Sequence, residues 1–452
     1  MGRITLEQAA QWCGGTVNPK YKDVTFLGAN NDTRKLKPGQ LFVALQGVRD
    51  GHDFIPAAME KGAGAVLCTH CDGDYPAIVV EDTRLALGDI ARGERQRLGM
   101  QVVGITGSVG KSTTKEMVAA VLGSTYRVNK TPANHNNDIG MPMAILEMPE
   151  DTQIAVLEMG MNHFGEIGYL TGIARPDVAV IVNIGTMHIE HLGSIEGILQ
   201  AKLEILEGLK EGGAIVLNGD DPLLWNQHKV LSQATYFGAG NTECGVFASD
   251  VSEENGKISF CVSTPKEKFD IRLHLEGLHY VPDALAAVTV GLCLGVSGDQ
   301  IAKSLANFQN MEDRQEIFEA NGYTIIKDCY NAGPESMAAA LAVLGNKPGR
   351  KIAVLGDMLE LGFNAPAEHY RLGRIVAEKA DMLFAYGPNS DRVLSGAITG
   401  GMSDIKASAF YDRDKMVEFL KQRAMPGDVL LFKGSHGMHM ELALEKFLSE
   451  EK

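Results

Sequence analysis

The sequence predicts an α/β protein of three domains, and three observations lead to that fold class. At 452 residues the chain is too long for one ordinary domain, and its 45% of hydrophobic residues can supply several cores. Short apolar runs alternate with helical patterns through most of the chain, which is typical of parallel sheets covered by helices. A glycine-rich turn at residues 106–113 joins an apolar strand to a helix, as in phosphate-binding α/β units.

The first domain is predicted to span residues 1–83 as a small α/β unit. Its short apolar runs are separated by turn signals such as Pro38-Gly39. A helix is expected over residues 85–98, because apolar residues recur there at helical spacing before Gly99. The strands of this domain are expected at residues 42–45, 64–68 and 77–80.

The central domain is predicted to span residues 84–312 around a mostly parallel sheet, and the third domain, residues 313–452, is predicted to be Rossmann-like. Residues 215–275 carry shorter, more polar runs, which favour an antiparallel flank. The expected central strands are residues 102–106, 154–158 and 178–182, and the expected central helices are residues 111–123, 196–208 and 283–294. In the third domain the expected strands are residues 323–326, 352–355, 382–385 and 429–432, and the expected helices are residues 334–345, 366–380 and 413–423.

Charge and composition exclude several classes of partner. The formal net charge is −15 and no long basic stripe is present, so we expect neither nucleic acid nor anionic membrane as a partner. We also expect no membrane span and no signal peptide, because no apolar run has the required length. Seven dispersed cysteines indicate reduced thiols and a cytoplasmic location. Cys68 and Cys71 form a lone C-x-x-C without a second pair at zinc spacing, so no metal role is expected there.

The strongest local signal is the turn T-G-S-V-G-K-S-T at residues 106–113. Its glycines let the backbone wrap an anion, and the amides at the helix N-terminus attract negative charge. Lys111 can reach the β- and γ-phosphates of a nucleotide, and the Ser112 hydroxyl can bind Mg²⁺. Ile105 stands where the longer P-loop pattern has its first glycine, and the loop favours ATP without excluding GTP. The nucleotide-binding residues predicted here are Gly107, Ser108, Val109, Gly110, Lys111, Ser112 and Thr113.

Three further candidates follow the strands of the central domain. Glu158 closes the strand at residues 154–158, and His188 lies just beyond the strand at residues 178–182. Lys202 lies on the helix predicted after them. Each residue alone is more simply explained as a surface or packed side chain. Ligands of open α/β sheets bind at the carboxyl ends of the strands. Because Glu158, His188 and Lys202 follow a phosphate loop in this order, the sequence favours one shared site for all three.

These segments resemble the Mur ligase family, and the strings N-H-F-G-E-I and A-K-L-E-I, at residues 162–167 and 201–205, resemble its D-alanyl-D-alanine-adding members. The resemblance implies a three-domain ligase of peptidoglycan synthesis. Such an enzyme uses ATP to activate the carboxylate of UDP-N-acetylmuramoyl-tripeptide (UDP-MurNAc-tripeptide) as an acyl phosphate and couples it to D-alanyl-D-alanine. The implied catalytic residues are Lys111, Glu158, His188 and Lys202. The implied ligands of two Mg²⁺ ions are Ser112, Glu158, His188 and Lys202, the last as a carbamate formed from CO₂.

The resemblance extends to both ends of the chain. The first domain resembles the UDP-sugar-binding domain found in the family, and the third would bring D-alanyl-D-alanine and close on ATP. The implied substrate-binding residues are Asp32, Thr33, Arg34, Gly47, Asn136, Asn137 and Lys433. The implied further ATP contacts are Asp283, Arg314, Asp328, Tyr330 and Asn331, with Asp328 on the ribose hydroxyls and Arg314 near the γ-phosphate.

The sequence makes four departures from the motifs of the family, one of which affects two positions. Gly333, Asp313 and His436 replace the usual Asn, Gly and Arg, and the block at residues 277–285 lacks both of its usual Asn residues. The last departure leaves the adenine contact open, because an ionised Asp283 cannot donate a hydrogen bond as an amide does.

Two alternatives remain open at this stage. A Mur-type ligase that adds the third peptide residue would share the first domain and the phosphate loop, although the D-N-P-R string of its diamino-acid specificity loop is absent. A regulatory P-loop NTPase would hydrolyse its nucleotide without forming an amide. We expect a monomer, and the sequence does not distinguish lysine from diaminopimelate as the third residue of the tripeptide.

Overall fold

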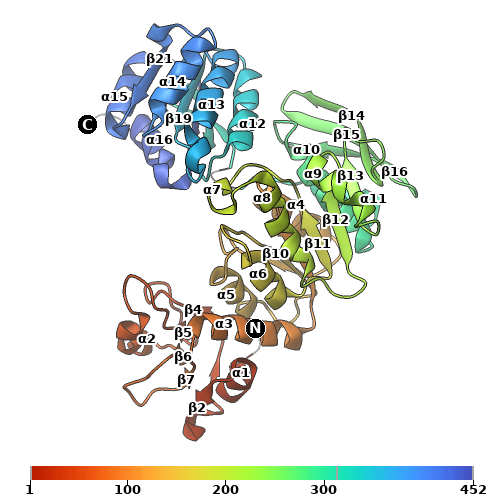
Figure 1. The fold of residues 1–452 in the computed structure, drawn as a ribbon, viewed down its shortest axis with the longest axis vertical. Helices are drawn as coiled ribbons and strands as arrows, with labels where there is room; N and C mark the ends of the chain where they lie inside the picture. The colour runs from red at the N-terminus through yellow and green to blue at the C-terminus, as the bar shows by residue number, and fades with distance from the viewer. Residues whose placement is uncertain (1–2, 312–313, 450–452) are drawn as a thin grey trace.

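The computed structural model describes residues 3–311 and 314–449, which form three sheet-bearing units in succession along the chain (Figure 1). The units lie one after another from the N-terminal end of the molecule to the C-terminal end. The predicted α/β class with three units is confirmed. The predicted junction at residues 312 and 313, with Asp313, lies outside the described residues.

The first unit contains a five-stranded sheet in the order β2-β7-β6-β5-β4, in which only the β2-β7 pair is antiparallel. Helix α1 contacts β2 and β7, and α3 leads into the central unit, where it contacts α5 and α6. Asp82 caps α3 by accepting hydrogen bonds from two backbone amides, and Gly99 ends the helix with a φ of 64°. The elements are β1 Ile4–Thr5, α1 Leu6–Cys13, β2 Thr16–Val17, β3 Thr25–Phe26, β4 Ala29–Asn30, β5 Leu41–Val43, α2 Ile55–Glu60, β6 Ala65–Cys68, β7 Ala77–Val79 and α3 Thr83–Leu98.

The central unit contains a nine-stranded sheet in the order β16-β15-β14-β13-β12-β11-β8-β10-β9. The strands are β8 Gln101–Thr106, β9 Val128–Lys130, β10 Ile154–Glu158, β11 Val178–Ile181, β12 Ala214–Asn218, β13 Thr235–Gly238, β14 Val246–Glu254, β15 Lys257–Ser263 and β16 Lys268–Leu273. The prediction of an antiparallel flank over residues 215–275 is wrong for its first half, because β12, β13 and β14 pair in parallel. Only the pairs β14-β15 and β15-β16 are antiparallel.

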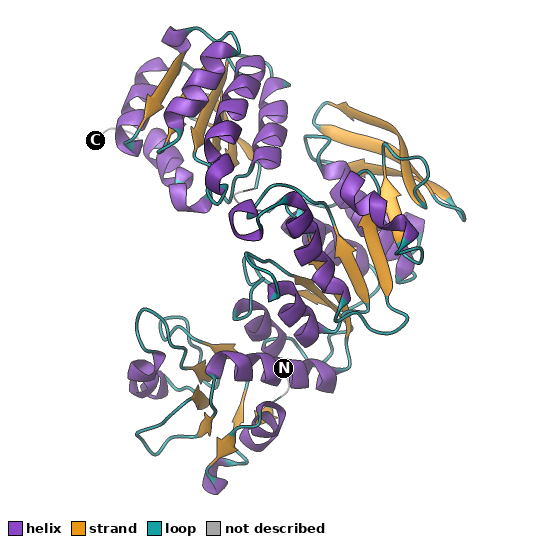
Figure 2. Ribbon diagram, viewed as in Figure 1, coloured by secondary structure: helices purple, strands orange, loops and turns teal. Residues whose placement is uncertain are grey.

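Helices cover both faces of the parallel part of the central sheet (Figure 2). Successive strand residues point to opposite faces, so Val102 packs with residues of α6 and α8, whereas Val103 packs with residues of α4 and α10. The predicted helix at residues 196–208 ends earlier than expected, at Leu203, and a short 3-10 turn follows. The helices are α4 Lys111–Gly123, α5 Gly140–Leu146, α6 Glu166–Ala174, α7 Ile189–Leu192, α8 Ile195–Leu203, α9 Pro222–Trp225, α10 Tyr280–Cys293 and α11 Gly298–Ala306.

The C-terminal unit has a six-stranded sheet in the order β17-β18-β22-β19-β20-β21, parallel except for the β17-β18 hairpin. The sequence analysis did not anticipate β17, β21, α14 or α16. The elements are β17 Glu316–Ala320, β18 Tyr323–Asp328, α12 Pro334–Gly345, β19 Lys351–Gly356, α13 Ala365–Lys379, β20 Met382–Tyr386, α14 Ser390–Thr399, β21 Ala407–Phe410, α15 Arg413–Arg423, β22 Val429–Lys433 and α16 Met440–Leu448. None of the helices described in the chain combines the length and the apolar character needed to cross a membrane.

Candidate active site

A cavity of about 520 Å³ lies between the central and C-terminal units. The central unit contributes the phosphate loop and the segments that follow β10 and β11, and the C-terminal unit contributes the segment between β18 and α12. Most of the predicted site residues line this one cavity. They are Ser108, Val109, Gly110, Lys111, Ser112, Thr113, Asn136, Asn137, Glu158, His188, Asp283, Arg314, Asp328, Tyr330, Asn331 and Lys433.

The phosphate loop is held in shape by Asn183, which the sequence analysis did not single out. The Oδ1 of Asn183 accepts hydrogen bonds from the backbone amides of Ser108 and Val109, both at 3.0 Å. Its Nδ2 donates to the carbonyl of Val109 at 2.9 Å. Gly110, with a φ of 81°, then turns the chain into α4. The site of Asn183, just beyond β11, is the only signal in the sequence that could have identified it.

Lys111 lies at the first position of α4, directly after the loop. Its Nζ donates to the carbonyls of Gly107 at 2.8 Å and Ser108 at 3.2 Å, so the side chain folds back over the loop. Burial lowers the pKa of Lys111, while the nearby Glu158 carboxylate raises it. The ammonium therefore lies against the loop and at the cavity, beside a backbone that can wrap a phosphate.

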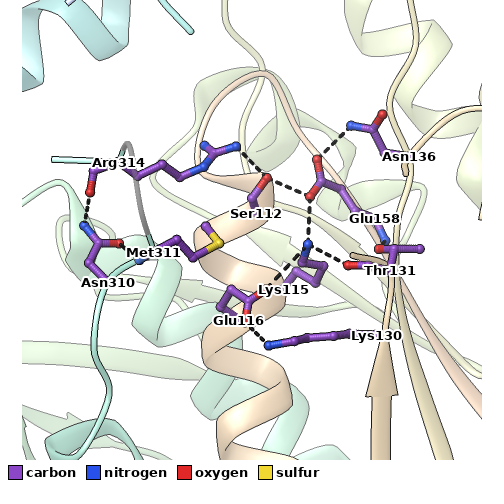
Figure 3. A network of polar contacts seen from close by, with 10 residues as sticks. All are labelled: Ser112, Lys115, Glu116, Lys130, Thr131, Asn136, Glu158, Asn310, Met311 and Arg314. Atoms are coloured by element: carbon purple, nitrogen blue, oxygen red, sulfur yellow. Dashed lines mark hydrogen bonds and ion pairs between the residues drawn. The ribbon is translucent and has the colours of Figure 1, made fainter. Parts of the chain in front are cut away.

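Glu158 is nearly fully buried and has polar partners on both oxygens (Figure 3). Its Oε2 accepts a hydrogen bond from the Ser112 hydroxyl at 2.7 Å, and its Oε1 accepts one from Nδ2 of Asn136 at 2.9 Å. Arg314, from the other side of the cavity, donates to the same Ser112 hydroxyl at 2.9 Å. The carboxylate and the hydroxyl are hard oxygen donors, so this pair fits a magnesium ion.

His188 and Lys202 differ in how they relate to the cavity. His188 lines it from the turn before α7, and its Nδ1 lies 2.6 Å from Oε2 of Glu360 in the C-terminal unit. This contact lowers the pKa of the Glu360 carboxyl. Lys202 does not line the cavity and is only 2% exposed on α8. Burial holds the pKa of Lys202 well below its ordinary value, and the nearby charge of Lys111 lowers it further.

The C-terminal wall of the cavity is organised by Lys433 at the end of β22. Its Nζ lies 2.6 Å from Oδ2 of Asp328 and donates to the carbonyl of Asn331 at 2.9 Å. The guanidinium of Arg314 lies over the ring of Tyr330, 4.0 Å from its centroid. These contacts form two groups on one wall, which adjoin where Asn331 follows Tyr330 in the chain.

Glu335, another residue missed by the sequence analysis, ties this wall to the central unit. Its Oε1 accepts hydrogen bonds from the amide and the hydroxyl of Thr186, at 3.0 and 3.1 Å. Close by, Gly333 stands where the family motif has Asn, and a Cβ there would lie 2.8 Å from Cγ of Met187. This contact gives a steric reason for glycine at position 333.

The predicted UDP-sugar residues lie at a second cavity, of about 620 Å³, in the first unit. The cavity is lined by Asn31, Asp32, Thr33, Arg34, Arg49 and Phe54, of which Asn31, Arg49 and Phe54 were not predicted. The Asp32 carboxylate pairs with Arg34, which lowers the pKa of Asp32 to about 2. Gly47 lies exposed in a nearby loop and lines neither cavity. Asn137 has a local role as well, since its Oδ1 accepts from the amide of Gly140 at 2.8 Å.

Asp283, which belongs to α10, lies against the phosphate loop. Its Oδ1 accepts a hydrogen bond from the Thr114 hydroxyl at 3.0 Å, and a Cβ on Gly110 would lie 2.3 Å from that same oxygen. Burial raises the pKa of Asp283 to about 8, although the Thr114 hydrogen bond acts in the opposite direction. A protonated Asp283 can donate a hydrogen bond, so the departure from Asn preserves a donor at neutral pH.

Replacing Asp283 with Asn is expected to remove a pH dependence of stability. Because the folded-state pKa is about 8 and the ordinary value is 3.8, the folded protein holds this proton more tightly than the unfolded chain. The free energy of unfolding therefore falls as pH rises from 4 to 8, with a slope of up to about 1.4 kcal/mol per pH unit from this group. Urea unfolding at several pH values measures this free energy. The free energy of unfolding of the Asp283→Asn variant should increase relative to that of the parent as the pH rises toward 8. A constant difference across this range would contradict the prediction.

Three family models match the chain. They are the Mur ligase family catalytic domain over residues 24–95, the Mur ligase middle domain over residues 105–291 and the Mur ligase glutamate ligase domain over residues 313–436. Among curated relatives, the UDP-N-acetylmuramoyl-tripeptide–D-alanyl-D-alanine ligase of Bacillus subtilis is 41% identical, covering 98% of this chain and 97% of the relative. The ligase of the same name from Escherichia coli is 35% identical, with 97% of each chain covered.

Solved structures are similar over the whole chain as well. A crystal structure of MurF from Acinetobacter baumannii is 33% identical, with a TM-score of 0.92 and all of both chains covered. MurF ligase from Thermotoga maritima in complex with ADP is 31% identical, with a TM-score of 0.82, and the match covers 93% of this chain and 97% of that one.

Proposed function

This chain belongs to the Mur ligase family, and we propose that it joins D-alanyl-D-alanine to the carboxylate of UDP-N-acetylmuramoyl-tripeptide at the expense of ATP. The observation that carries this function is the identity to ligases of that name along the full length of both chains. The resemblance predicted from the phosphate loop and the strings after it is confirmed.

The reaction proceeds in two steps. A carboxylate oxygen of the tripeptide attacks the γ-phosphorus of ATP, ADP leaves and an acyl phosphate forms. The amine of D-alanyl-D-alanine then attacks the acyl carbonyl, phosphate leaves and the nitrogen loses a proton to give the amide. Both steps bring anionic groups together, so the protein contributes mainly positioning and positive charge.

Lys111 and Arg314 supply that charge from opposite sides of the cavity. Lys111 stands at the head of α4 beside the phosphate loop, and Arg314 reaches Ser112 at 2.9 Å from the opposite wall. Both cations can therefore contact a phosphoryl group above Ser112. Asp328, Tyr330 and Asn331 would border the rest of the nucleotide.

The hydroxyl of Ser112 and Oε2 of Glu158, which lie 2.7 Å apart, would hold Mg²⁺. His188 would be a further metal ligand, and a second Mg²⁺ would bind in the same cavity. A Mg²⁺ ion held there would offset the negative charge of the phosphates. Asn136 keeps the Glu158 carboxylate turned toward Ser112, since it binds the other carboxylate oxygen.

Lys202 would carry a carbamate. Within the described residues its buried ammonium has no hydrogen bond or ion pair, which is costly for a charged group. The neutral amine can add to the carbon of CO₂ and lose a proton, which gives a carbamate anion. That anion is an oxygen ligand suited to Mg²⁺, whereas an ammonium repels it.

The three units divide the work in this proposal. Residues 1–83 would bind the UDP-sugar at the cavity lined by Asp32, Thr33 and Arg34, residues 84–312 would hold the phosphates of ATP, and residues 313–452 would bring D-alanyl-D-alanine. We place the reaction in the cytoplasm, and we expect the enzyme to act as a monomer. The cytoplasm supplies ATP and keeps thiols reduced, which suits the seven dispersed cysteines of the sequence.

ADP release is expected to require both substrates together. A ligase transfers the phosphoryl group to the tripeptide and turns over only when the amine is present, whereas a regulatory NTPase releases ADP alone. The measurement is coupled ADP release with UDP-MurNAc-tripeptide, with D-alanyl-D-alanine, and with both. The lysine and diaminopimelate forms of the tripeptide are compared in parallel. Equal release without either substrate would overturn the proposed function, and use of a free amino acid with a UDP-dipeptide would assign the chain to another step.

A further inference from the structure

Lys115 is a buried lysine in the central unit that the reaction described above does not use. It lies in α4 one turn after Lys111, and its side chain is completely buried. Residues four apart lie on the same face of a helix, so Lys115 follows Lys111 inward beneath the cavity floor. It does not line the cavity, and it therefore contacts neither nucleotide nor substrate there.

The Nζ of Lys115 joins three segments that are far apart in the sequence (Figure 3). It donates a hydrogen bond to the carbonyl of Thr131 at 2.9 Å and lies 3.6 Å from Oε2 of Glu158. The hydroxyl of Thr131 in turn accepts a hydrogen bond from the backbone amide of Glu158 at 3.1 Å. Lys115 thus connects α4 to the end of β10 and to the loop that carries Asn136.

The charges around Lys115 are balanced. Oε1 of Glu116 lies 3.6 Å from Nζ of Lys115, and Glu116 also forms an ion pair with Lys130 at the protein surface. Cations and carboxylates therefore alternate from the surface inward, in the order Lys130, Glu116, Lys115 and Glu158. A buried ion pair adds little net stability compared with apolar residues of the same volume, so stability alone explains this arrangement poorly.

The Lys115 ammonium can also fix the orientation of the Glu158 carboxylate. Oε2 of Glu158 accepts a hydrogen bond from the Ser112 hydroxyl and forms an ion pair with the Lys115 ammonium, whereas Oε1 accepts a hydrogen bond from Asn136. Without Lys115, the carboxylate would keep two hydrogen bonds from neutral groups, Ser112 and Asn136, and would lose the cation that forms an ion pair with it among the described residues. Groups behind a metal ligand commonly fix its orientation, and their loss costs about 10- to 100-fold in metal affinity or activity.

We propose that Lys115 is a positioning residue that holds the Glu158 carboxylate in register with Ser112 for metal binding. This inference rests on the proposed function only in taking Glu158 as a metal ligand. Lys115 acts through Glu158 and Thr131 and contacts none of the reacting atoms. Its effect is therefore expected on the metal dependence of the enzyme and not on its affinity for the nucleotide without metal.

The test compares Lys115→Met with Lys130→Met, which removes the exposed cation of the same network. Binding of Mn²⁺ in the presence of ADP is followed by electron paramagnetic resonance, and binding of ADP alone is followed by calorimetry in EDTA. Lys115→Met is expected to weaken Mn²⁺ binding at least about 10-fold and leave ADP binding in EDTA unchanged. Lys130→Met is expected to change either affinity less than about threefold. Unchanged or tighter Mn²⁺ binding by Lys115→Met would overturn the proposal.

A double-mutant cycle separates positioning from a general loss of structure. In a Glu158→Gln background, Lys115→Met should cause no further loss of Mn²⁺ affinity, because the group on which Lys115 acts has been changed. Independent, additive losses would show a structural role instead and would contradict the proposal. If Lys115→Met does not fold, the variant Lys115→Met/Glu116→Gln removes one charge of each sign and carries the same expectation. These measurements need neither peptide substrate, so they are independent of the ADP-release assay of the proposed function.

Discussion

Replacement of Lys111 with Ala is expected to reduce turnover by at least about 10³-fold. The side chain is the cation nearest the phosphate loop, and preorganised positive charge at a transferring phosphoryl group is among the largest contributions to such reactions. The loss should appear mainly in kcat, since Asn183 still holds the phosphate loop in shape through the amides of Ser108 and Val109. Steady-state ADP release with both substrates measures it.

The control for this variant is Lys130→Ala, which removes a lysine from the same domain outside the cavity. Its turnover should stay near that of the parent, and thermal unfolding should show that both variants are folded. If Lys111→Ala keeps most of its activity, the phosphate loop has no part in the mechanism.

Replacement of Lys202 with Ala is expected to reduce turnover at least about 100-fold, and small carboxylic acids such as acetate or formate should restore much of it. The substitution removes a buried side chain and leaves a space in which a small carboxylate can supply the anionic oxygens of the lost carbamate. Turnover is measured as a function of acetate concentration at fixed ionic strength.

Two comparisons make the Lys202 result specific. Acetate should not rescue Lys111→Ala, because that lysine acts as a cation. In the parent protein, ¹³C-labelled CO₂ should give a carbamate signal in the nuclear magnetic resonance spectrum that is absent from Lys202→Ala. Absence of both rescue and signal would argue against carbamylation.

At the site, the C-terminal unit contacts the loop between β11 and α7 of the central unit. Thr186 binds Glu335, Met187 packs against Gly333, and His188 lies against Glu360. Arg314 adds a fourth contact at Ser112. The position of this unit therefore controls the surroundings of two proposed metal ligands, His188 and Ser112.

The sequence alone determined the features that are encoded locally. The phosphate loop was evident because glycines and Lys-Ser-Thr stand between an apolar strand and a helix, and Glu158 was evident because it closes a buried strand. Strand and helix periodicity likewise predicted three α/β units, since each element carries its own apolar pattern.

The tertiary structure decided what depends on pairing between distant segments. The direction of β12 and β13 could not be predicted, because a buried apolar run has the same pattern in either orientation. Lys111 and Lys115 are the same residue type one turn apart, and only the fold directs one to the cavity and the other to Glu158. Asn183 reaches a loop 75 residues away for the same reason. Burial and contact between segments are set by sheet topology, which no local pattern contains.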